Sequence, residues 1–205
     1  MTGSRYLLML AALCADGYGI AAAPPHLSQQ LPGDSVYRLD TTLTDQDGGN
    51  FKLENLSGRP VLIAMFYASC KYVCPLIVDA MSRIDRALSG DEKRAVHLLL
   101  VSFDSERDTP GVLKEMAAQR HLDTTRWTLA RTDAAGVRKL AAVLGVQYRA
   151  TTTGEFNHSS IITLLDSEGR IVARTARMSE QDQDLLQSLQ HELARNKGAG
   201  ADPGR

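Results

Sequence analysis

Residues 61–175 alternate between apolar runs of strand length and amphipathic runs of helical period, and this alternation limits the fold more than any other feature of the chain. Residues 61–67 (VLIAMFY) and 96–103 (VHLLLVSF) are continuous apolar runs, which is typical of central strands covered on both faces. Between them, apolar residues recur every three or four positions from Leu76 to Leu88, which predicts a helix with one buried stripe.

The rest of the chain continues the pattern. Repeated strand–helix units predict an α/β domain with crossover helices on a largely parallel sheet. A terminal antiparallel hairpin and a final helix are typical of a thioredoxin-like fold, here preceded by an N-terminal β-hairpin. The remaining expected elements are a hairpin around residues 45–49, a helix at 108–120, a strand at 127–130, a helix at 134–144, a hairpin of residues 159–165 and 170–175, and a helix that opens at Ser179 with a capping box completed by Asp182 and ends near Asn196.

Length and charge limit the class of protein. A chain of 205 residues with 43% hydrophobic content is expected to form one domain with a well-buried core. The net charge is −1 and no basic run is present, so nucleic-acid binding is not indicated. We expect a monomer.

The first 23 residues have the order of a secretory signal peptide: Arg5, an apolar run, then small residues. The apolar run stops at Asp16, well short of the roughly 20 residues that span a bilayer. We therefore expect an exported, periplasmic protein, which would be membrane-associated if the leader were retained. The expected organisation is a signal peptide (1–23), a Pro-rich arm (24–35), one domain (36–195) and a flexible tail (196–205).

Cys70 and Cys74 are the cysteines left once a leader that contains Cys14 is removed. Exported cysteine pairs are by default disulfides. Residues four apart on a helix lie about 6 Å from each other, which is compatible with a disulfide and equally with two thiolates on one ion. Their place between a buried strand and a helix is where α/β sheets put functional sites. The helix N-terminus, helped by Lys71, is expected to favour a thiolate.

His158 is the natural third ligand, because the segment before the last hairpin would lie beside the first helix. Two thiolates suit Cu(I), and an added imidazole lets the same site hold Cu(II). Structural zinc normally takes four protein ligands, whereas three are expected here. The ordinary C-x-x-C dithiol spacing is absent, but a redox pair remains open.

Four segments together resemble the Sco/SenC family of copper-assembly proteins: TLTDQDGG, GRPVLIAMFYASCKYVCP, VSFDSERDTP and NHSSIITLLDSEGRIV. The resemblance implies a thioredoxin-like fold and copper held by Cys70, Cys74 and His158. It also implies a metallochaperone that delivers copper to the binuclear copper centre of cytochrome c oxidase, or keeps the cysteines of that centre reduced. The implied partners are a copper-accepting oxidase subunit and another periplasmic copper chaperone or a thiol reductant.

Three positions depart from the family pattern, and two other functions use the same cysteines. Lys71 stands where the family commonly has proline, Asn157 stands where it often has aspartate, and Ser105 stands where it often has proline. A thiol-disulfide oxidoreductase would tolerate loss of His158. A redox or copper sensor would need neither metal transfer nor turnover.

Overall fold

The structure is a computed structural model and describes residues 31–70, 73–152 and 155–200. The predicted signal peptide (1–23), residues 24–30 of the predicted arm, Lys71 and residues 201–205 of the predicted tail lie outside the described residues. None of the helices in the described part is long and apolar enough to cross a membrane.

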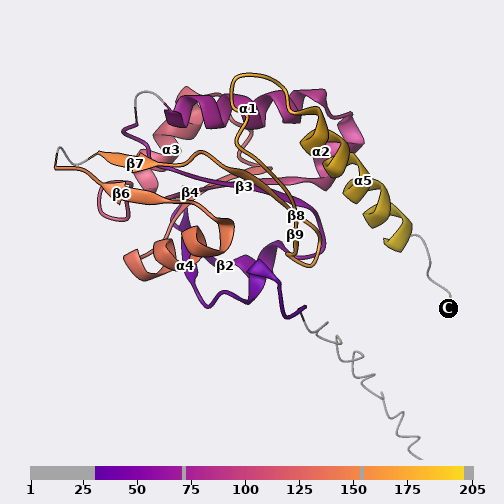
Figure 1. Ribbon diagram of the computed structural model, residues 1–205, viewed down its shortest axis with the longest axis horizontal. Coiled ribbons are helices and arrows are strands. Elements are labelled where there is room, and N and C mark those ends of the chain that lie inside the picture. Colours follow the sequence, from indigo (N-terminus) through magenta and orange to yellow (C-terminus); the bar gives the residue numbers. More distant parts are fainter. Residues whose placement is uncertain (1–30, 71–72, 153–154, 201–205) are drawn as a thin grey trace, which may run out of the picture. The chain divides into compact units, whose positions relative to one another are not determined.

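A seven-stranded sheet forms the centre of the domain (Figure 1). Its strands are β1 (Thr42–Asp45), β2 (Asn50–Lys52), β3 (Val61–Phe66), β4 (His97–Ser102), β5 (Trp127–Arg131), β8 (Ile162–Leu165) and β9 (Ile171–Thr175). The spatial order is β2-β1-β5-β4-β3-β8-β9. The central strands β3, β4 and β5 are parallel, and the two hairpins β1–β2 and β8–β9 add antiparallel strands on either side. The predicted α/β class and thioredoxin-like arrangement are confirmed.

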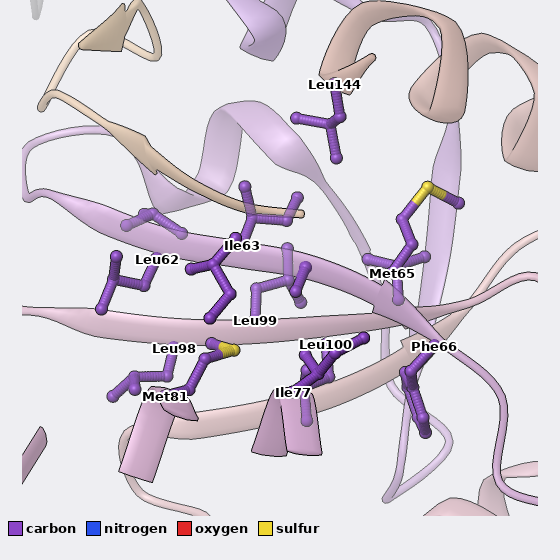
Figure 2. Close-up of a cluster of buried hydrophobic side chains, with 14 of the residues drawn as sticks. Leu62, Ile63, Met65, Phe66, Ile77, Met81, Leu98, Leu99, Leu100 and Leu144 are labelled. Carbon is purple, nitrogen blue, oxygen red and sulfur yellow. The ribbon is translucent and has the colours of Figure 1, made fainter. Parts of the chain in front are cut away.

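Helices cover both faces of this sheet. They are α1 (Val73–Ala87), α2 (Gly90–Ala95), α3 (Pro110–Gln119), α4 (Ala134–Leu144), α5 (Gln183–Gly200) and the short 3-10 helices η1 (Val36–Arg38) and η2 (Leu53–Leu56). Figure 2 shows Ile77 and Met81 of α1 on the side of Leu98, with Leu144 of α4 on the opposite side near Met65. Every residue of β3 and β4 is buried. Both strands are therefore sandwiched, as their continuous apolar runs predict.

Capping residues fix where α3 begins and where α4 begins and ends. Thr109 caps α3 by accepting the N–H of Val112, and Asp133 caps α4 by accepting the N–H of Gly136. Side-chain oxygens at these positions satisfy N–H groups that have no partner within the helix. α4 ends at Gly145, whose φ of 75° is left-handed and suits glycine. The predicted helices at 108–120 and 134–144 are confirmed.

Two expectations about the C-terminal helix are wrong. α5 begins at Gln183 rather than Ser179, because Asp182 is itself the cap that accepts the N–H of Leu185. The same helix continues to Gly200 rather than ending near Asn196. At the other end of the described chain, the Ser35 hydroxyl donates to the carbonyl of Glu168 and accepts the N–H of Tyr37, which ties the last residue of the predicted arm to the domain.

A helix and a two-stranded ribbon, besides η1 and η2, were not anticipated. α2 carries no buried residue, and a capping box holds its start: the Ser89 hydroxyl accepts the N–H of Glu92, and the Glu92 carboxylate accepts the N–H of Ser89. A separate two-stranded ribbon joins β6 (Tyr148–Ala150) to β7 (Phe156–His158). This ribbon carries His158 to the end of the sheet where the cysteines lie.

His97, the first residue of β4, is expected to make the fold acid-sensitive. Burial, then Arg59 and Arg126, lower its pKa from 6.5 to about 4. The unfolded chain therefore binds this proton first, so stability is full above about pH 6.5 and falls as the pH drops towards 4. A pKa difference of this size corresponds to a loss of about 3 kcal/mol.

Urea denaturation between pH 4 and pH 7, with His97→Gln beside the unsubstituted chain, measures this effect. Titration of the carboxylates affects both proteins and cancels in the difference. The variant should lose about 3 kcal/mol less stability than the unsubstituted chain over this range. If the free energies of unfolding of the two proteins fell in parallel between pH 7 and pH 4, His97 would not be the cause of the acid sensitivity.

Candidate metal centre

Cys70 and Cys74 flank the start of α1, at the C-terminal end of β3. Both carry a thiol side chain; Cys70 is half-buried and Cys74 is only 1% exposed. The Cys74 N–H points at the Cys70 sulfur at 3.4 Å, and the Tyr67 N–H points at the Cys74 sulfur, also at 3.4 Å. Cys70 lies outside α1, so the two cysteines do not share one helix as their spacing suggested; the Cys70 sulfur instead accepts the backbone N–H of Cys74.

His158, the last residue of β7, reaches the same point from the other half of the chain. Its Nε2 lies 3.8 Å from the Cys74 sulfur, and its Nδ1 lies 3.1 Å from the carbonyl oxygen of Ser159. Because a carbonyl only accepts, Nδ1 carries the proton in this contact, which leaves the Nε2 lone pair facing the cysteine. The predicted proximity of His158 to the cysteines is confirmed.

The three donor atoms form one cluster. The Cys70 and Cys74 sulfurs and a ring nitrogen of His158 all lie within 4.8 Å of one another, and this is the only such group of three or more potential ligands found among the described residues. Metal–sulfur bonds of about 2.3 Å place two sulfurs roughly 4 Å apart. A small contraction of this cluster would therefore hold one ion.

The expectation of a ready thiolate is wrong for Cys74. Burial raises the pKa of this thiol far above its usual value, although the N–H of Tyr67 opposes the shift, and the neighbouring Cys70 raises it further. Desolvation disfavours the anion more than the hydrogen bond from the Tyr67 N–H favours it. Cys74 is thus a buried thiol whose proton must leave when a metal binds.

Aromatic rings surround the cluster, and the sequence pattern alone does not reveal them. Tyr67 and Phe103 follow β3 and β4, while Tyr148 and Phe156 belong to the β6–β7 ribbon. The Phe103 ring lies 4.9 Å from the His158 ring and stacks on Tyr148 at 5.6 Å. The ribbon is therefore held to the sheet by ring packing, and this packing places the imidazole.

Asp108 anchors the loop that carries Cys70. Its carboxylate is 1% exposed, accepts the N–H of Ala68 at 2.8 Å and accepts the hydroxyl of Ser102. Desolvation by burial raises the pKa of Asp108. Arg107 pairs with Asp104 in the same segment, and Asp108 fixes the cysteine loop.

Asp108→Ala is expected to lower stability by about 2 to 3 kcal/mol, because the buried Ser102 hydroxyl and the partly buried Ala68 N–H lose their acceptor. Denaturant unfolding of the reduced chain measures the change. Glu106→Ala, at an exposed position in the same segment, is the matched control and should stay within about 0.5 kcal/mol. Equal stability of the two variants would mean that Asp108 does not anchor the loop.

The fold and this cluster define a thioredoxin-like protein with a Cys–Cys–His metal-ligand set. Residues 31–194 match the SCO1/SenC family, and the chain belongs to that family.

Relatives and solved structures agree with this assignment. Yeast (Saccharomyces cerevisiae) mitochondrial SCO2 is 27% identical over 146 residues, which are 70% of this chain and 48% of the yeast protein. The chain thus spans about half the length of that relative. The structure of Bradyrhizobium japonicum ScoI with copper bound is 27% identical with a TM-score of 0.60, covering 77% of this chain and 96% of ScoI. BsSco, described as a member of the Sco family of cytochrome c oxidase assembly proteins, is 22% identical with a TM-score of 0.67 and coverages of 77% and 94%.

Proposed function

We propose that Cys70, Cys74 and His158 bind one copper ion. The observation that carries this proposal is the meeting of the three donor atoms within 4.8 Å, although Cys74 and His158 are 84 residues apart in the chain. Two sulfurs and one imidazole match the ligand preferences of Cu(I) and also admit Cu(II). The copper-bound structure of B. japonicum ScoI, a relative with the same fold, supports the choice of metal.

The proposed role is delivery of copper to a respiratory oxidase subunit in the periplasm. Cys70 and His158 are partly exposed, whereas Cys74 is buried. An acceptor can therefore approach the ion from the Cys70 and His158 side while Cys74 still holds it. Export is supported by the order of residues 1–23, and the oxidase by the description of BsSco as a member of the Sco family of cytochrome c oxidase assembly proteins.

A second candidate function is reduction of the acceptor's cysteines. A partly exposed thiol beside a buried one is suited to disulfide exchange, because the accessible sulfur attacks and the buried one then resolves the mixed disulfide. In this step Cys70 and Cys74 lose two electrons and two protons to form a disulfide, and the acceptor's disulfide gains them to become two thiols.

Transfer experiments separate the two functions. The chain loaded with Cu(I) is mixed with the copper-site domain of an oxidase subunit, and copper and free thiols are measured in both proteins after separation. Copper delivery predicts that, after separation, the acceptor contains the copper and its cysteines are reduced. Reduction without any movement of copper would reject the delivery role and support the reductase role.

A further inference from the structure

Tyr67 contacts all three members of the ligand cluster. It lies directly after β3 and is 4% exposed. Its backbone N–H points at the Cys74 sulfur at 3.4 Å. Its ring meets the His158 imidazole edge to face, with centroids 5.9 Å apart and planes at 81°.

The Tyr67 hydroxyl links Cys70 to the ribbon that carries His158. This oxygen accepts the N–H of Phe156 at 3.4 Å, two residues before His158, and the side chain is hydrogen-bonded to Cys70. A phenol has one proton to donate. A metal-bound thiolate has no proton and can only accept, so with a metal bound the Tyr67 hydroxyl is the donor in its hydrogen bond to Cys70.

The other aromatic rings around the site contact fewer of the three ligands. The Phe103 ring lies against His158, while the ring contacts of Tyr148 are with Phe103 and Phe156. Tyr67 is thus the residue through which both cysteines and the histidine are linked.

We infer that Tyr67 is a positioning residue of the copper site, and that its hydroxyl donates to the Cys70 sulfur and weakens the donation of that sulfur to the metal. The inference rests on the proposed copper binding. A hydrogen bond to a thiolate ligand withdraws electron density from the sulfur, so it disfavours Cu(II) relative to Cu(I) and raises the reduction potential. Tyr67 therefore biases the site towards Cu(I).

Tyr67→Phe tests this role, because it removes the hydroxyl and keeps the ring. The full chain is loaded with Cu(II), and its thiolate-to-copper absorption band and reduction potential are measured. In the variant the band should move to longer wavelength and the potential should fall. The ratio of Cu(I) to Cu(II) affinity should fall about tenfold, as expected for loss of one hydrogen bond to a charged group.

Two further proteins separate this effect from a change in packing. Tyr148→Phe removes a phenol hydroxyl from the same ring cluster and should leave the band and the potential unchanged. A 3-fluorotyrosine at position 67, whose hydroxyl is a stronger donor, should move the band to shorter wavelength, opposite to Tyr67→Phe.

Each outcome decides between the inference and the proposed function. A wild-type copper band that Tyr67→Phe does not move, or that Tyr148→Phe moves equally, overturns the role of Tyr67 and leaves copper binding intact. Absence of any thiolate-to-copper band in the wild-type chain overturns the proposed copper site, and the inference with it.

Discussion

Cys74→Ser is expected to weaken Cu(I) binding by at least about 100-fold. Loss of a group that only orients a metal ligand already costs 10- to 100-fold in affinity, so loss of a ligand costs at least as much. Serine keeps the size of the side chain and an acceptor for the Tyr67 N–H, so the fold should persist. Competition with a chromogenic Cu(I) chelator gives the affinity.

The control for this experiment lies in the same loop. Ser69 is exposed and next to Cys70, so Ser69→Ala changes the loop without removing a ligand and should bind copper as the unsubstituted chain does. Thermal unfolding of all three proteins confirms that they are folded. Retention of full Cu(I) affinity by Cys74→Ser would exclude the buried thiol as a ligand.

Gly169→Ala is expected to have the largest effect on stability, a loss of about 3 kcal/mol. Gly169 lies in the β8–β9 turn with a φ of 83°, where a side chain costs about 1 to 2 kcal/mol. A Cβ at this position would also lie 2.6 Å from the Ser35 hydroxyl oxygen and 2.6 Å from the Tyr37 ring. Forcing a methyl group into a packed region adds about 1 to 3 kcal/mol.

Gly48→Ala isolates the two contributions. Gly48 has nearly the same φ, 86°, but a Cβ added there would point into open space, with no contact within 4 Å. This variant should lose only the backbone contribution, about 1 to 2 kcal/mol. Denaturant unfolding of both variants gives the difference. Equal losses would mean that the packing of η1 against the β8–β9 turn adds nothing to the effect.

The sequence predicts the elements whose pattern follows directly from burial. β3 and β4 are continuous apolar runs because both faces are covered, and α4 covers the predicted residues 134–144. α2 escapes prediction because it buries no residue and so has no apolar period. The β6–β7 strands are three residues long and largely exposed, so neither alternation nor a continuous run marks them.

The ligands are predictable and their surroundings are not. Cys70 and Cys74 stand at a strand–helix junction, and topology brings His158 to it, so spacing and fold together predict the cluster. The raised pKa of Cys74 depends on burial by residues remote in sequence. The Phe103 and Tyr67 rings become neighbours of His158 only once the sheet is formed.

Copper titration of the reduced chain, with His158→Ala beside it, tests the three-ligand site most directly. Absorption and electron paramagnetic resonance are recorded as Cu(II) is added. The three-ligand site predicts one equivalent of copper with strong thiolate-to-Cu(II) absorption, altered or lost in the variant. Loose binding of copper, with identical spectra for both proteins, would contradict it and leave Cys70 and Cys74 as a redox pair.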